Sequence, residues 1–174
     1  MKKRFVNRRM AALVSALLLA LVMAVPASAG GKGATQVSGI GFPDEPDPAE
    51  AVCTELPFDY TIVMTGDLEG CVYGVITSSK GPTASGVYKE RADETFVGSY
   101  KGKYVGTFEM RENFHARFDL DSGNELFGFC KHPIVKGSGT GDFAGVLGRL
   151  DFRDDVDDPD NVSFPYKGHL RNLD

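Results

Sequence analysis

The sequence predicts an all-β protein, a closed antiparallel β-barrel of about eight strands. Three observations lead to this prediction. Apolar and polar residues alternate with a period of two through most of the chain after Leu56. Turns containing glycine separate these runs at intervals of about 8–12 residues, and no amphipathic run has the period of a helix. A barrel is preferred to an open sandwich because closure removes the edges that so many strands would otherwise expose.

The first 29 residues have the layout of a secretory signal peptide. The basic residues 2–9 precede an uncharged apolar run from Met10 to Val25, and Ala27-Ser28-Ala29 is a small-residue cleavage motif. The apolar run is shorter than the roughly 20 residues of a transmembrane helix, so a retained membrane anchor is the less favoured alternative. We therefore expect a secreted, extracellular protein of bacterial type, with no membrane association after cleavage.

Residues 30–55 are predicted to be a flexible leader, because they are rich in glycine and proline and end with acidic residues. The barrel domain is expected over residues 56–174. The full chain has a net charge of −5, and removal of residues 1–29 leaves 14 basic and 24 acidic residues. This acidity argues against a nucleic-acid partner and against docking on an anionic membrane surface.

The expected strands follow from the alternation. In chain order they are residues 58–65, 71–78, 87–99 (as one bent strand or two short ones), 104–119, 126–135, 143–153 and 164–171. Gly-containing turns such as Gly66 and Gly123 separate them.

Residues 104–119 carry the clearest pattern. Their even positions are mostly apolar or aromatic and their odd positions are almost all polar, which predicts a strand with one buried and one solvent-exposed face. This strand is long enough to favour a coiled barrel wall over a flat sheet. With its neighbours it yields the residues expected to line a ligand cavity: Tyr60, Tyr88, Tyr104, Phe108, Met110, Phe114 and Phe118.

Two carboxylates are candidate catalytic groups. Glu112 is the one charged residue on the apolar face of residues 104–118, and Glu90 shares the parity of Tyr88. A carboxylate that faces a closed apolar cavity has a raised pKa and can act as a general acid. The favoured alternative is a bulge near Glu112 that turns its side chain outward, or a place at the barrel rim.

The final pair of strands allows a register to be predicted. If residues 154–163 connect them, placing Asp151 opposite Lys167 brings Phe152 beside Tyr166. Leu150 then lies opposite Gly168, where the absent side chain leaves room for it.

Three cysteines allow one disulfide and leave one thiol. We expect Cys71 and Cys130 to be bonded, because both lie in predicted strands that a barrel holds in register, whereas Cys53 lies in a polar segment. The alternative is a zinc site of the three thiols with His132, which the absence of a C-x-x-C pair disfavours. No metal or cofactor is therefore expected.

The remaining motifs are assigned to the surface. His115, His132 and His169 are expected to be surface residues, and the sequence has no G-x-S-x-G motif of a serine hydrolase. The acidic run from Asp154 to Asn161 offers oxygen ligands for calcium but lacks the glycine and glutamate of an EF-hand. A solvated hairpin loop is the favoured interpretation of this run.

The segment from Gly137 to Phe152, GSGTGDFAGVLGRLDF, resembles a signature of the allene oxide cyclase and dirigent β-barrel families. There a G-x-G-T-G-x-F-x-G-x-x-G run joins two strands. The resemblance implies an eight-stranded, calycin-like barrel with an apolar cavity, as in uncharacterised secreted bacterial members. Plant members cyclise a fatty-acid epoxide or steer the coupling of phenoxy radicals, but none of their catalytic residues can be matched to this sequence.

Three functions are consistent with these features. The first is the binding of a small apolar molecule in the barrel cavity. The second is a cyclase or isomerase of allene oxide cyclase or dirigent type, with Glu112 or Glu90 as its ionisable group. The third is an extracellular structural or interaction protein with a filled core. A cavity of at least about 300 Å³ would favour the first two, and an inward-facing Glu112 would favour the second.

Overall fold

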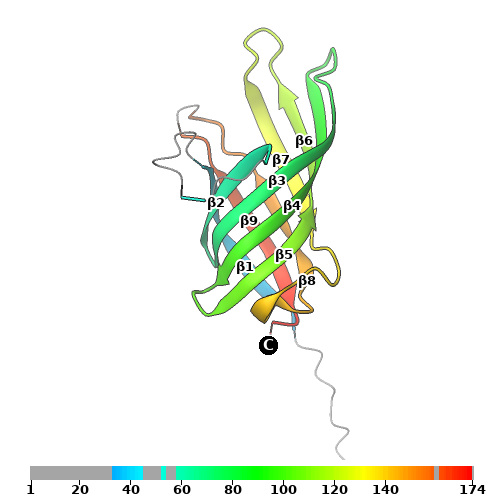
Figure 1. Ribbon diagram of the computed structural model, residues 1–174. Helices are drawn as coiled ribbons and strands as arrows, with labels where there is room; N and C mark the ends of the chain where they lie inside the picture. The colour runs from blue at the N-terminus through cyan, green and yellow to red at the C-terminus, as the bar shows by residue number, and fades with distance from the viewer. Residues whose placement is uncertain (1–32, 45–51, 54–57, 159–160, 174) are drawn as a thin grey trace, which may run out of the picture. The chain divides into compact units, whose positions relative to one another are not determined.

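The computed structural model describes residues 33–44, 52–53, 58–158 and 161–173, so the predicted signal peptide lies outside the described residues. Nine described strands form one sheet, which closes into an eight-stranded antiparallel β-barrel with one additional strand (Figure 1). The elements are β1 (Thr35–Pro43), β2 (Tyr60–Gly66), β3 (Leu68–Lys80), β4 (Val87–Tyr100), β5 (Tyr104–Arg111), β6 (Asn113–Phe118), β7 (Glu125–Pro133), the 3₁₀ turn η1 (Gly141–Phe143), β8 (Leu147–Arg153) and β9 (Phe164–Arg171). The predicted all-β barrel is confirmed.

Strand β4 closes the ring. The strands follow one another in the order β3-β2-β1-β9-β8-β7-β6-β4, and β4 pairs with β3 to complete the circle. The other edge of β4 has two partners, since residues 87–90 pair with β6 and residues 93–100 pair with β5. Strands β5 and β6 therefore occupy one place in the ring in succession. They are the predicted long strand, interrupted at Glu112.

The side chains of β5 alternate as predicted. Phe108 and Met110 are buried, whereas Val105, Glu109 and Arg111 are exposed. The inward residues join a core cluster contributed by most strands of the barrel. Burial of these large side chains, each worth about 1.5–3 kcal/mol, is the main favourable contribution to folding.

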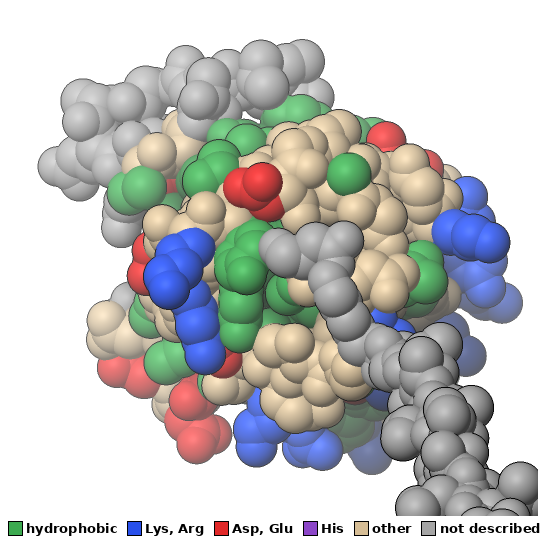
Figure 2. Space-filling view, turned by 90° about the horizontal axis from the view of Figure 1, so that it is seen from below, with side chains coloured by type: hydrophobic (Ala, Val, Ile, Leu, Met, Phe, Trp, Pro, Cys, Tyr) green, Lys and Arg blue, Asp and Glu red, His purple; other side chains and the backbone are tan. Residues whose placement is uncertain are grey.

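One end of the barrel is closed by η1 and the glycine-rich segment before it. The fully buried ring of Phe143 packs edge-on against Phe96 and Phe108, with centroid distances of 5.9 and 5.2 Å. The Thr140 N–H donates to the carbonyl of Thr107 on β5, so this segment also covers an edge of β5. Figure 2 shows this end, where most of the charged side chains lie toward the border and a few lie nearer the middle.

Residues 35–43 form a strand, so the prediction of a flexible leader is wrong for this segment. Strand β1 pairs with β2 on one edge and with β9 on the other. Its inward positions include Val37, Gly39 and Gly41, and a side chain at Gly39 would overlap Tyr166. Large side chains from neighbouring strands thus occupy the space beneath two glycines, and those glycines hide the alternation in the sequence.

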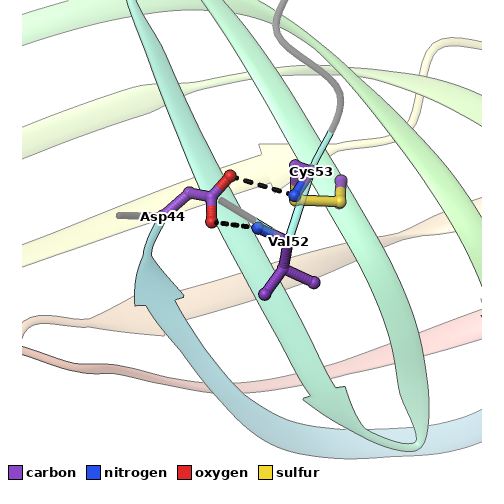
Figure 3. Close-up of a disulfide and its surroundings, with 4 residues drawn as sticks. Asp44, Val52 and Cys53 are labelled. Carbon is purple, nitrogen blue, oxygen red and sulfur yellow. Dashed lines mark hydrogen bonds between the residues drawn. A yellow bond between two sulfur atoms is a disulfide. The ribbon is translucent and has the colours of Figure 1, made fainter. Parts of the chain in front are cut away.

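The disulfide joins Cys53 to Cys71, which corrects the predicted Cys71–Cys130 pair (Figure 3). Cys71 is next to the inward-facing Val72 and therefore points outward from β3, whereas Cys130 is buried on β7 with a free thiol. The two strands are also not neighbours in the ring. The carboxylate of Asp44 accepts the N–H groups of Val52 and Cys53, each at 3.0 Å, and so fixes the segment that carries Cys53.

The predicted register of the last two strands is confirmed. Asp151 lies opposite Lys167, Phe152 opposite Tyr166 and Leu150 opposite Gly168. A side chain at Gly168 would overlap Leu150, so the glycine does provide the room that Leu150 needs.

The described part of the chain contains no helix with the length and apolar character needed to cross a bilayer.

This register predicts unequal costs for two neighbouring substitutions. Phe152 is 2% exposed and packs on Tyr166 with a centroid distance of 5.3 Å, so Phe152→Ala should lower the free energy of unfolding by about 3–5 kcal/mol. Asp151 pairs with Arg149 at 2.7 Å on the exposed face, so Asp151→Ala should cost less than about 1 kcal/mol. Denaturant melts measure both, and a larger loss for Asp151→Ala would contradict the assigned faces.

The disulfide predicts a second stability difference. Cys53 and Cys71 are 18 residues apart, and a crosslink over such a loop stabilises by about 3 kcal/mol in the chain-entropy model. The double variant Cys53→Ser/Cys71→Ser should lose about that amount in denaturant melts. Peptide mapping without reduction should link Cys53 to Cys71 in both the natural chain and Cys130→Ser. A peptide linked through Cys130 would show that the pairing is different.

Candidate functional site

A cavity of about 200 Å³ lies in the half of the barrel away from η1. Its lining comes from seven of the strands, the break between β5 and β6, and the start of the β8–β9 connection: Pro43, Tyr60, Thr61, Ile62, Glu90, Glu112, Phe114, Cys130, His132, Phe152, Asp154 and Phe164. The volume is below the roughly 300 Å³ expected for a typical ligand pocket. It exceeds the approximately 150 Å³ of an engineered cavity that admits benzene, so it suits a molecule of about one ring.

The cavity uses only part of the predicted lining. Tyr60 and Phe114 line it, as do both candidate carboxylates, Glu90 and Glu112. The other five predicted residues lie elsewhere: Phe108 and Met110 are in the core, Tyr104 packs against the core, and Tyr88 and Phe118 pack on each other with a centroid distance of 5.8 Å. Alternation predicts the face on which a side chain lies but not its level along the barrel axis.

A buried pair formed by Glu94 and His132 lies at the cavity and is absent from the sequence-based predictions. His132 Nδ1 donates to Glu94 Oε2 at 2.5 Å, and both side chains are at most 2% exposed. The hydroxyl of Tyr60 donates to Glu94 Oε1 at 2.8 Å. Both oxygens of Glu94 are therefore hydrogen-bonded, and among the described residues His132 Nε2 has no partner.

His132 is thus a correction to the prediction that the histidines lie at the surface. It shares the inward parity of Cys130 on β7, although Pro133 follows it directly. The alternation of residues 126–135 was the signal in the sequence that could have placed His132 on the inward face, two residues after Cys130. Glu94 gave a similar signal, because it shares the inward parity of Ala92 and Phe96 on β4.

A glycine allows Tyr60 to reach Glu94. In the sheet, Tyr60 on β2 lies opposite Gly74 on β3, which lies opposite Glu94 on β4. A side chain at Gly74 would overlap the ring of Tyr60. The ring therefore lies across β3 in the space that Gly74 leaves, and its hydroxyl meets the carboxylate two strands away.

The interruption between β5 and β6 places Glu112. Its N–H donates to the carbonyl of Ala92 at 2.8 Å, and its side chain is 8% exposed. A break is present where the sequence analysis considered a bulge, but it directs Glu112 into the cavity. Burial, with a smaller contribution from the negative charge of Glu94, raises the pKa of Glu112 to about 8. Among the described residues Glu112 Oε2 has no hydrogen-bond partner.

The other groups at the cavity are also perturbed. Burial lowers the pKa of His132, but the charge and hydrogen bond of Glu94 outweigh this effect, so the pKa is above its usual value. Burial raises the pKa of the Cys130 thiol well above its usual range, and Glu112 adds to this rise. Burial, followed by the charge of Glu94, raises the pKa of Tyr60. Glu112, Cys130 and Tyr60 therefore keep their protons to a higher pH than such groups do in water.

Three of these residues could also hold a metal ion. Glu112, Cys130 and His132 each offer one ligand atom, and these atoms lie within 4.8 Å of one another. This set differs from the three-thiol site considered in the sequence analysis, because Cys53 and Cys71 are bonded to each other. Without a metal, the same groups offer an acid and a hydrogen-bond acceptor to a ligand in the cavity.

Two further carboxyl groups, Glu125 and Asp154, crowd together beside Gly128. A side chain at Gly128 would overlap an oxygen of each carboxyl group. Burial, together with the charge of Asp154, raises the pKa of Glu125 to about 8. The pKa of Asp154 is also raised, mainly by burial.

Comparison with known proteins yields no relative: no family model, no curated protein and no solved structure matches the chain. The resemblance of Gly137–Phe152 to the allene oxide cyclase and dirigent barrels therefore stays a prediction.

The crowded carboxyl pair predicts a pH dependence of stability. Because the folded-state pKa of Glu125 is raised, its contribution is fully favourable near pH 4 and is lost as pH rises through about 8. Glu125→Gln should therefore be more stable than the natural chain at pH 8, by about 1 kcal/mol for this half-exposed group, and similar to it at pH 4.

Denaturant melts at the two pH values measure this difference. Glu109→Gln on the exposed face of β5 is the matched control and should show no such gain at pH 8. An equal effect of the two substitutions would contradict the raised pKa of Glu125 beside Asp154.

Proposed function

We propose that this protein is an exported β-barrel that binds a small, largely apolar molecule with one hydrogen-bonding group. The observation that carries the proposal is the composition of the cavity wall. Ile62, Phe114 and Phe152 supply apolar surface, while Glu112 Oε2 and His132 Nε2 lack partners among the described residues. A buried polar atom without a partner costs about 1–3 kcal/mol. A hydroxyl or carbonyl of a ligand would satisfy these atoms.

Two features support export. A disulfide between Cys53 and Cys71 persists in oxidising compartments and is rare in reducing ones. Residues 1–29 have the layout of a secretory signal peptide of bacterial type. Together they favour a secreted protein that meets its ligand outside the cytoplasm.

A cyclase or isomerase of allene oxide cyclase or dirigent type is the second candidate, and the inward direction of Glu112 favours it. The carboxyl group of Glu112 and the imidazole of His132 line the same cavity. Two such groups can donate a proton at one atom of a bound molecule and accept one at another. The cavity volume of about 200 Å³ is below the 300 Å³ expected of a binding barrel and so favours a filled structural barrel, the third candidate. That candidate gives no reason for the buried Glu112 Oε2 and His132 Nε2, which lack partners among the described residues.

The first experiment examines the protein from its own host. Native mass spectrometry of the mature chain should reveal a bound molecule of about one ring.

A second experiment uses a defined probe. Calorimetry on chelator-treated protein should show that 4-methylphenol binds about 5–10-fold more tightly than toluene, because its hydroxyl gains one hydrogen bond to the cavity wall.

Cavity filling supplies the control for this experiment. Ile62→Trp places a large side chain in the cavity wall and should abolish binding of 4-methylphenol, whereas Val75→Trp on the exposed face of β3 should leave it unchanged. Circular dichroism should show that both variants are folded. Equal affinity for the two probes, or binding retained in Ile62→Trp, would place the binding site elsewhere.

A further inference from the structure

The starting observation is a set of three different donor atoms at one point of the cavity wall. Cys130 and His132 project inward from β7, two residues apart, and Glu112 projects from the break between β5 and β6. Their ligand atoms lie within 4.8 Å of one another, and all three residues are buried. His132 Nε2 and Glu112 Oε2 have no partner among the described residues, so two of the donors point to a missing neighbour.

The second observation is the orientation of His132. Its Nδ1 donates to Glu94, which fixes the plane of the ring, so Nε2 is the nitrogen whose lone pair can bind a cation once any proton on it is released. Histidine ligands of metal ions almost always donate their other ring nitrogen to a carboxylate, carbonyl or water in this way. Tyr60 in turn donates to Glu94, so the carboxylate is itself held in place.

From this arrangement we propose that Glu112, Cys130 and His132 bind a zinc-class divalent cation at the cavity wall, with Glu94 as a positioning residue. No metal site was expected from the sequence, because the three cysteines include no C-x-x-C pair.

The donor chemistry selects the class of cation. Zinc accepts thiolate sulfur, imidazole nitrogen and carboxylate oxygen, whereas magnesium and calcium prefer oxygen ligands alone. A thiolate and a carboxylate carry two negative charges, which a divalent cation neutralises. The protons of the Cys130 thiol and of the Glu112 carboxyl group, with any proton on His132 Nε2, pass to solvent when the cation binds. The cation thus removes the cost of two buried groups that otherwise lack partners.

The spacing requires a small adjustment. Bond lengths of about 2.0–2.3 Å in a tetrahedral site place ligand atoms about 3.3–3.8 Å apart. The observed spread of up to 4.8 Å closes to this range if the side chains move inward by about 1 Å. The ring of His132 is held by Glu94, so rotation about the side-chain bonds of Glu112 and Cys130 has to supply this movement.

Three protein ligands leave a fourth position, and all three residues line the 200 Å³ cavity. Structural zinc sites usually have four protein ligands, whereas sites that bind water or a substrate keep one position open. The arrangement is therefore of the open type. The cation site does not depend on the proposed binding of an apolar molecule, because each can be measured without the other.

Cobalt is the first probe, because its spectrum reports the ligands. Protein without an affinity tag, treated with a chelator and with its disulfide intact, should bind one equivalent of Co²⁺ with visible d–d bands and a thiolate-to-cobalt charge-transfer band. Cys53 and Cys71 are bonded, so Cys130 is the thiol that can produce this band. Added Zn²⁺ should displace the cobalt. Absence of the charge-transfer band in the natural chain would overturn the proposal.

Variants assign the ligands. Cys130→Ser should lose the charge-transfer band, and His132→Gln should bind Zn²⁺ at least tenfold more weakly in calorimetry. Glu94→Gln should lower the affinity about 10–100-fold but keep the band, as expected for a residue that acts through His132. His115→Gln, on the outer face against Phe129, is the matched control and should match the natural chain. A band that persists in Cys130→Ser would overturn the assignment.

Thermal melts of the natural chain give a readout that needs no variant. An excess of Zn²⁺ should raise Tm by several degrees, since a ligand of the folded state stabilises it, and Mg²⁺ should not. An unchanged Tm with Zn²⁺ would contradict the site. The binding of 4-methylphenol is measured in chelator-treated protein, so failure of one proposal does not imply failure of the other.

Discussion

Closure of the barrel depends on the two-sided pairing of β4. One edge of this 14-residue strand pairs with β3, and the other passes from β6 to β5 at Glu112. A small ring leaves an interior that inward side chains must fill, and Phe96, Phe108 and Phe143 fill the half near η1. The other half contains the strand break, and there the hydrogen bond from Glu112 to Ala92 replaces regular pairing. The site therefore lies where the ladder is least regular.

The polar groups of this half are not arranged for maximal stability. A buried ion pair such as Glu94–His132 loses hydration that its mutual attraction only partly restores, and an apolar pair of similar size is often at least as stable. The cost is limited because Tyr60 and His132 satisfy both oxygens of Glu94. Gly74 makes this possible by leaving space for the ring of Tyr60. Such local costs concentrate at positions that serve binding or chemistry.

Much of the fold, but little of the site, could be predicted from the sequence. Alternation identified the faces of β5 and β6 and the register of β8 against β9, because a side-chain period of two leaves no other buried face. Glycine concealed β1, since it counts as neither apolar nor polar. The predictions for Cys53 and His132 were wrong because the bond of Cys53 to Cys71 and the contact of His132 with Glu94 join segments far apart in the sequence. Which segments lie close together is set by the three-dimensional order of the strands.

The pairing of β1 with β9 has a consequence for the order of synthesis. These are the first and last strands described, and Thr35 lies opposite Leu170. A nascent chain can form pairings among β2 to β8, but the ring stays open until β9 has been made. Contacts so distant in sequence form slowly, and the unpaired edges of β1 and β8 remain open to other chains meanwhile. Premature termination would leave an open sheet prone to aggregation rather than a smaller barrel.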